Sequence, residues 1–199
     1  MPCIKNNKTM NRLGDVYTRT VYNSLKLKSI STSTNFAILK LFVEDQDLLV
    51  KYEKKAGDHN KKILNNLFFD SGFDIFLPQD TEFEGLDSTF VDFEIKAEML
   101  YCDVILDLVT NSPFVIHPRS SMSKLPIMLS NHTGIIDSGY RGNIIGAFRS
   151  FTSCEIEQDT RLLQICHPSL CPIFVVLVDE KQLSLTERKS GGFGSSGVK

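Results

Sequence analysis

The sequence lacks several features that mark particular classes of protein. Its longest strongly apolar run, residues 171–178, is far shorter than the roughly 20 residues of a membrane-spanning helix. No secretory apolar segment follows the N-terminus. The formal net charge of −2 gives no general case for binding nucleic acid or an anionic membrane. We therefore expect an intracellular protein of the cytoplasm or nucleus, with no membrane contact and no direct nucleic-acid binding.

Paired cysteine spacing is also missing. The five cysteines are Cys3, Cys102, Cys154, Cys166 and Cys171, an odd set without a CxxC motif. His167 lies beside Cys166, but no second pair of ligands at zinc-finger spacing exists. We expect reduced, mostly buried thiols.

Charge is distributed unevenly along the chain. Residues 1–31 hold six Lys or Arg side chains against Asp15 alone, so residues 1–34 are predicted to form a disordered basic arm. A transit peptide is a weaker interpretation of this arm. The apolar run at 36–43 predicts a first strand. The charged segment 44–67 favours a helix broken near Gly57, which we interpret as a solvated surface insertion away from any site.

Short apolar segments dominate from Phe68 onward, separated by Asp, Gly, Pro and Ser at intervals of about ten residues. This pattern predicts an all-β sandwich or barrel over residues 35–185. The expected strands are 73–77, 89–95, 98–108, 113–117, 133–136, 143–149, 162–166 and 172–178. Residues 186–199 are too rich in Gly and Ser to fold alone, so we expect a flexible C-terminal arm.

The central motif is NHTGIIDSGYRGNIIG at residues 131–146. Two apolar runs flank a polar centre, which predicts a β-hairpin with tight turns at Gly139 and Gly142. Its tip would present a carboxylate, a phenol and a guanidinium together. Alone, this pattern is more typical of a solvated hairpin tip than of a functional site.

Four further segments carry chemistry: DSGFDIFLP at 70–78, PRSS at 118–121, TRLLQI at 160–165 and TERKSGGFGSSG at 186–197. An Arg and a Ser directly after a strand can bind phosphate oxygens. The tail glycines can place backbone N–H groups around an anion. Phe193 lies among glycines, where it can stack on a planar base.

Taken in order, these five segments resemble the five motifs of the homotrimeric dUTPase family, over about residues 68–199 and the strand at 36–43. The resemblance implies a distorted jelly-roll β-barrel with a short helical insertion and flexible N- and C-terminal arms. It also implies a homotrimer with shared interfacial sites. The implied reaction is Mg²⁺-assisted hydrolysis of dUTP to dUMP and pyrophosphate, which limits uracil incorporation into DNA and supplies dUMP.

The resemblance further implies roles for individual residues. Asp137 would orient and deprotonate the attacking water, and Tyr140 would pack on the deoxyribose. Asp74 would contact the metal indirectly, through water. The remaining implied substrate contacts are Arg119, Ser120, Ser121, Asn131, Gly134, Ile135, Ile136, Gly146 and Gln164 in the β domain, and Arg188, Phe193, Gly194, Ser195 and Ser196 in the C-terminal arm.

Two other functions remain open from the residues. A dCTP deaminase relative would need a glutamate in the strand after the hairpin, and residues 143–148 contain none. A dUTPase-like regulatory or binding protein could use the basic arm and segment 44–67 to dock a partner. The sequence also departs from the family pattern at Ser121, Gly139 and Thr160, positions that bear on how tightly the site binds.

Overall fold

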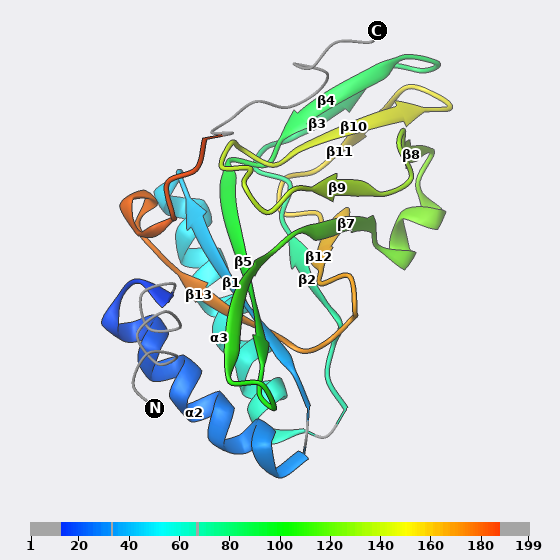
Figure 1. Ribbon diagram of the computed structural model, residues 1–199. Coiled ribbons are helices and arrows are strands. Elements are labelled where there is room, and N and C mark those ends of the chain that lie inside the picture. Colours follow the sequence, from blue (N-terminus) through cyan, green and yellow to red (C-terminus); the bar gives the residue numbers. More distant parts are fainter. Residues whose placement is uncertain (1–12, 33, 67, 188–199) are drawn as a thin grey trace, which may run out of the picture.

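The computed structural model describes residues 13–32, 34–66 and 68–187, whose arrangement is shown in Figure 1. Helices α2 (Val16–Thr32) and α3 (Gln46–Asn65) flank a set of short strands. The strands are β1 (Phe36–Val43), β2 (Gly72–Ile75), β3 (Thr81–Phe83), β4 (Ser88–Asp92), β5 (Ile95–Asp103), β6 (Leu108–Ser112), β7 (Phe114–Pro118), β8 (Ile127–Leu129), β9 (Gly134–Ile136), β10 (Ile145–Ser150), β11 (Cys154–Ile156), β12 (Leu163–Cys166) and β13 (Ile173–Leu177). Two short 3₁₀ turns are η1 (Ser120–Lys124) and η2 (Glu180–Gln182). Within the described part, no helix combines the length and apolarity needed to cross a membrane.

The described strands form four sheets, ordered β13-β1-β5-β6, β2-β12-β7-β9, β4-β10-β8 and β11-β3. Only the β1–β13 pairing among them is parallel. The predicted jelly-roll-like β fold is confirmed, with the qualification that its sheets stay open and do not close into one barrel.

Strand β1 is covered on both faces, which explains its unbroken apolar sequence. Because side chains alternate along a strand, Ile38 packs into the cluster that contains α2 residues, whereas Leu39 packs into the main core beneath α3. The strand predicted at 36–43 is confirmed at both ends.

Helix α2 corrects the prediction of a disordered arm over the part of residues 1–34 that the structure describes. Asp15 caps the helix by accepting hydrogen bonds from the backbone N and the hydroxyl of Thr18, at 2.8 and 2.7 Å. Tyr22 and Leu25 are buried against the sheet. Burial of these apolar side chains outweighs the polar composition on which the disorder prediction was based.

Helix α3 is continuous, so the predicted break near Gly57 is wrong. Asp45 caps its N-terminus, accepting from Leu48 N at 2.7 Å. A stripe of buried residues holds the helix against the core: Leu48, Tyr52, Ala56 and His59. A glycine inside a helix costs only about 1 kcal/mol relative to alanine, and this packing offsets it.

The predicted β-hairpin at residues 131–146 does not form. Strand β9 pairs with β7, and β10 pairs with β4 and β8, so the two flanking runs lie in different sheets. The polar segment between them is a connection from one sheet to another. Each run is too short to show from its sequence which partner strand it will choose.

Other differences concern short strands. The strand predicted at 98–108 is two strands, β5 and β6, joined by a turn in which Asp103 Oδ1 accepts from Ile105 N and Leu106 N. Strands β3, β8 and β11 were not predicted. Each has three residues, too few for a clear alternating pattern.

Candidate active site

Three adjacent strands bring together motifs that are far apart in the sequence. Gln164 on β12 lies opposite Asp74 on β2 and opposite His117 on β7. Residues directly opposite in antiparallel strands share one face of the sheet. Residues 70–78, 118–121 and 160–165 therefore meet at one place.

The Asp74 carboxylate is surrounded by cations. Arg119 Nε lies 2.8 Å from Oδ1, while Arg161 Nη1 and Lys55 Nζ each lie 3.1 Å from Oδ2. The Asp74 side chain is only 14% exposed. Three positive groups exceed the charge of one carboxylate, so an anion that approaches this place is attracted.

The position of Gln164 depends on a glycine in the neighbouring strand. A Cβ on Gly72 would lie 2.2 Å from Gln164 Oε1, so only glycine leaves room for the amide as placed. The amide nitrogen of Gln164 is 3.4 Å from the carbonyl oxygen of Pro118. Gly72 thus allows the side chain of Gln164 to lie across β2.

Arg119 leads into the 3₁₀ turn η1, which contains Ser120 and Ser121. Both serines are exposed, and Arg119 Nη1 lies 3.3 Å from Ser121 Oγ. Arg119 and Ser120 line a cavity of about 600 Å³, but Ser121 is not among its lining residues. The full lining is Lys55, His59, Lys62, Asp70, Ser71, Gly72, Asp74, His117, Arg119, Ser120, Arg161, Gln164, Cys166 and Leu170. We call this space the Asp74 cavity.

Asp137 lies in a second region, directly after β9. Its backbone carbonyl accepts a hydrogen bond from Tyr140 N at 3.0 Å, and its side chain is exposed. The Tyr140 hydroxyl donates to the carbonyl oxygen of Asn143 at 2.8 Å, which fixes the orientation of the ring. We call residues 137–143 the Asp137 turn.

Arg141 holds this turn to the rest of the molecule. Its Nη1 donates to the carbonyl oxygens of Ser138 and Tyr140, at 3.0 and 2.7 Å. Its Nε and Nη2 donate to the carbonyl and hydroxyl oxygens of Ser184, at 3.1 and 2.7 Å. Glu98, which is 1% exposed, lies 3.3 Å from Nη2 and accepts from both the N–H and the hydroxyl of Ser184.

Arg141 therefore joins the Asp137 turn to Ser184, a role that the sequence alone did not indicate. Burial lowers the pKa of Arg141 from its ordinary value, and the Glu98 carboxylate opposes that shift. Thr186 adds a hydrogen bond from its hydroxyl to the carbonyl oxygen of Gly139 at 2.5 Å. The Asp137 turn is therefore fastened to the segment that precedes the C-terminal residues.

The predicted base-reading positions lie beside this turn. Gly134 on β9 pairs with Ile116 on β7, and a Cβ there would lie 3.3 Å from Ile116 Cβ. Ile135 is exposed and Ile136 is half-buried. Gly146 is buried in β10, where a Cβ would lie 2.7 Å from the ring of Phe148, so packing alone already requires glycine.

The predicted site residues thus fall into groups. Asp74, Arg119, Ser120 and Gln164 share the Asp74 cavity, whose lining includes neither Asp137 nor Tyr140. Asn131 is exposed in the turn after β8. Arg188, Phe193, Gly194, Ser195 and Ser196 lie outside the described residues.

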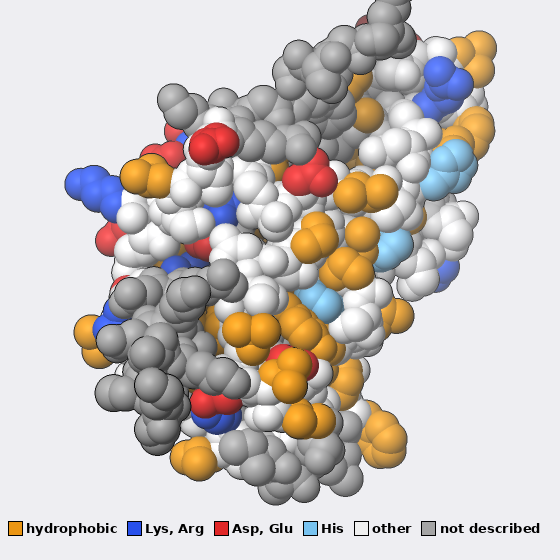
Figure 2. Space-filling view, in the orientation of Figure 1, with side chains coloured by type: hydrophobic (Ala, Val, Ile, Leu, Met, Phe, Trp, Pro, Cys, Tyr) orange, Lys and Arg blue, Asp and Glu red, His pale blue; other side chains and the backbone are white. Residues whose placement is uncertain are grey.

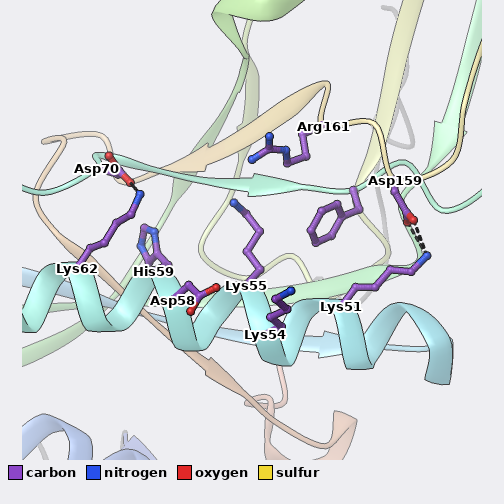
Figure 3. A pocket seen from close by; sticks show the side chains of 10 residues that line it. Lys51, Lys54, Lys55, Asp58, His59, Lys62, Asp70, Asp159 and Arg161 are labelled. Atoms are coloured by element: carbon purple, nitrogen blue, oxygen red, sulfur yellow. Dashed lines mark hydrogen bonds and ion pairs between the residues drawn. The ribbon is translucent and has the colours of Figure 1, made fainter.

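Sequence reasoning missed the contribution of α3 to this site. Lys55, His59 and Lys62 line the Asp74 cavity, although segment 44–67 was interpreted as solvated surface away from any site. Figure 3 draws an adjoining pocket, which shares Lys55, His59, Lys62, Asp70 and Arg161 with the Asp74 cavity. It shows Lys55 reaching from α3 toward Arg161, with Lys51 paired to Asp159 and Lys62 paired to Asp70. No local motif marks Lys55, because its partner Asp74 belongs to a different element.

The cysteines take no part in a described metal site. Cys102, Cys154, Cys166 and Cys171 are free thiols, and burial raises the pKa of Cys166 to about 11. His167 instead bonds to Ser112 Oγ and Ser169 Oγ. Over residues 13–32, 34–66 and 68–187, no group of three or more His, Cys, Asp or Glu side chains is placed to hold a metal ion.

Comparison with known proteins identifies relatives of this chain. The deoxyuridine 5'-triphosphate nucleotidohydrolase of Gloeothece citriformis is 35% identical over 120 residues, which cover 57% of this chain and 82% of that protein. The protein of the same name from Crocosphaera subtropica is 34% identical over 133 residues, covering 65% and 85%. Among solved structures, the native EIAV dUTPase aligns over 66% of this chain and 90% of that one, with 19% identity and a TM-score of 0.41.

A family model described as dUTPase matches residues 68–197, well over half of the sequence. The match includes the strands that form the Asp74 cavity and the Asp137 turn. The chain belongs to the dUTPase family.

Proposed function

We propose that this chain hydrolyses dUTP to dUMP and pyrophosphate, a reaction that limits uracil incorporation into DNA and supplies dUMP. The observation that carries this proposal is the meeting of three separate motifs, through Asp74, Arg119, Ser120 and Gln164, in one cation-rich cavity. Relatives over the same region bear the name deoxyuridine 5'-triphosphate nucleotidohydrolase. A triphosphate is the kind of polyanion that such a cavity attracts.

The phosphate chain is bound by complementary donors. Arg119 offers a planar fork of N–H groups and Ser120 an exposed hydroxyl, both suited to phosphate oxygens. Gln164 adds an amide donor on the same face. Phosphoryl transfer depends mainly on positioning and charge neutralisation, and these groups bind the phosphate chain and hold it in place for attack.

Asp137 acts as the general base. It takes a proton from water as the water oxygen attacks the α-phosphorus, and the bond from that phosphorus to the bridging oxygen breaks. The bridging oxygen leaves with the electron pair as part of pyrophosphate. General-base help of this kind typically contributes about 10²–10⁴-fold to the rate.

The described residues fit a Mg²⁺ ion that is held mainly by substrate phosphates. Asp74 has three cations at its two oxygens, which disfavours direct binding of a divalent ion. Oδ1 is paired with Arg119 and keeps acceptor capacity for a metal-bound water. When bound, Mg²⁺ would neutralise phosphate charge and stabilise the leaving pyrophosphate.

A homotrimer would complete the site. The Asp74 cavity lacks Asp137 and Tyr140 in its own lining, so a second copy would supply the Asp137 turn. Figure 2 shows hydrophobic side chains gathered in a band across one face of the molecule. Exposed apolar residues include Ile105, Ile135 and Phe151, at 75%, 73% and 58% exposure. Association would bury such surface.

Base and sugar recognition belong to the region around the turn. Tyr140 would pack on the deoxyribose, and the backbone of Gly134, Ile135, Ile136 and Gly146 would contact uracil, with Asn131 nearby. Ser121, Arg188, Phe193, Gly194, Ser195 and Ser196 would add contacts to the phosphates and the base.

The direct test is pyrophosphate release from each deoxynucleoside triphosphate in turn, with and without Mg²⁺. We expect turnover of dUTP that depends on Mg²⁺ and far slower turnover of the other substrates. A protein that leaves dUTP intact with Mg²⁺ present would remove the proposal. Measurement of the molar mass in solution tests the trimer separately.

A further inference from the structure

Helix α3 forms one wall of the Asp74 cavity, although it lies before the region that matches the family. Its buried stripe runs through Tyr52, Ala56 and His59. Lys55 and Lys62 lie beside that stripe and line the cavity. The helix therefore brings cations to the motif residues from outside the motifs.

Polar contacts with β13 and with Phe76 set the position of α3. The side-chain amide of Asn60 donates to the carbonyl of Val175 at 2.8 Å and accepts from its N–H at 2.9 Å. The Tyr52 hydroxyl accepts from Phe76 N at 2.9 Å, and His59 Nε2 lies 2.9 Å from the carbonyl oxygen of Ile173. The distance from α3 to Asp74 is thus fixed without any help from Lys55.

The Lys55 ammonium group contacts both the Asp74 carboxylate and the Phe73 ring. Its ammonium group lies 3.1 Å from Asp74 Oδ2 and 5.6 Å from the centroid of the Phe73 ring. The side chain is 19% exposed, and Figure 3 shows it extending into the space below Arg161. Since Arg119 and Arg161 also bind Asp74, Lys55 can turn toward a phosphate without leaving that carboxylate unpaired.

The charge of the cavity favours such an exchange. Lys55, Lys62, Arg119 and Arg161 line it together with two carboxylates, those of Asp70 and Asp74. The surplus is positive, and solvent screens Lys55 and Arg119 less than the other cations because their side chains are only 19% and 26% exposed. We propose that Lys55 binds the triphosphate chain of the substrate, which makes α3 part of the active site. This inference rests on the proposed function.

Calorimetric titration of the full chain tests it, with dUMP, dUDP and a non-hydrolysable dUTP analogue as ligands, all with Mg²⁺. Lys55→Met removes the charge and keeps the length of the side chain. We expect the Kd of the dUTP analogue to rise about tenfold, as for the loss of one charge-assisted hydrogen bond, while the Kd of dUMP changes less than about twofold. Lys55→Arg should restore most of the affinity.

Lys54→Met is the matched control, because Lys54 lies on the same helix but does not line the Asp74 cavity. It should leave all three Kd values unchanged. An equal loss for dUMP and for the dUTP analogue would assign Lys55 a structural role and overturn the inference, as would no loss at all. Failure of the unaltered protein to hydrolyse dUTP is a distinct result, since it removes the proposed function itself.

Discussion

The Asp74 cavity and the Asp137 turn are built by different means. In the cavity, strand register places Asp74 and Gln164 opposite each other, and cations from three separate segments surround the carboxylate. The turn has no strand partner of its own and depends on Arg141, whose donors bind three carbonyl oxygens and one hydroxyl. Binding groups thus lie on the sheet, whereas the proposed base lies on a separately fastened connection.

This difference predicts that phosphate affinity and turnover depend on different regions of the molecule. Changes in the Asp74 cavity should alter how tightly phosphates bind, because its side chains face the anion. Changes at the Asp137 turn should alter the rate of the chemical step and leave phosphate contacts in place. The two regions can therefore be perturbed one at a time.

The largest expected effect is at Asp137. We expect Asp137→Asn to lower kcat by about 10²–10⁴-fold because the amide cannot accept the proton from water. Affinity for a non-hydrolysable dUTP analogue should stay nearly constant, since the cavity residues are unchanged. Steady-state pyrophosphate release and titration calorimetry measure these two quantities, and unchanged turnover would take the base role away from Asp137.

Removal of the Arg141 guanidinium should come next in size. Arg141→Met leaves Glu98 buried without its cation, and breaking a buried pair in this way costs about 3 kcal/mol or more of unfolding free energy. The turn should also loosen, so kcat should fall more than affinity. Urea unfolding and steady-state kinetics test both expectations.

Arg149→Met provides the control for that change, because Arg149 is exposed on the neighbouring strand β10. It should alter the unfolding free energy by less than about 0.5 kcal/mol. If the two variants proved equally stable, the contacts of Arg141 would not be what fastens the turn. Arg141→Lys should recover the charge but not the forked donor geometry.

Much of the fold and of the cavity could be predicted from the sequence. Strand β1 was predicted at its observed bounds because its apolar run has no competing interpretation. The meeting of Asp74, Arg119 and Gln164 accords with the family resemblance, since each lies within a compact motif. For strand β1 and for these motif residues, the local sequence pattern was sufficient for the prediction.

Long-range partners explain what could not be predicted. Arg141 depends on Glu98 and Ser184, and Lys55 depends on Asp74, none of which is marked by any spacing in the sequence. The order of α2 likewise depends on burial of Tyr22 and Leu25 against strands that follow later. Such contacts exist only once the sheets have formed.

A smaller effect is expected at Gly72. A Cβ on Gly72 would lie 2.2 Å from Gln164 Oε1 and would displace the amide. We therefore expect Gly72→Ala to raise KM about tenfold while kcat stays nearly constant. The cost in stability should be small because the end of a flexible side chain can move. Gly57→Ala is the control, since a Cβ on that helical glycine meets nothing within 4 Å. If the effect acts through Gln164, Gly72→Ala should add nothing to Gln164→Ala.

The smallest effect concerns pH and distinguishes the cavity wall from the turn. Burial lowers the pKa of His59 from its ordinary value near 6.5; the positive charges of Lys55 and Lys62 act in the same direction, while the Ile173 carbonyl and Asp70 oppose it. As the pH falls, His59 therefore becomes protonated in the unfolded chain before it does so in the folded protein. The contribution of neutral His59 to the free energy of unfolding is complete above about pH 6.5 and is lost as the pH falls through the lowered pKa of the folded protein. Urea unfolding at pH 7.5 and 5.5 should show a greater acid loss for the unaltered protein than for His59→Gln. Because His59 contacts the Ile173 carbonyl and anchors α3, we assign this acid loss to the cavity wall and not to the Asp137 turn. An identical acid loss in both proteins would contradict this assignment.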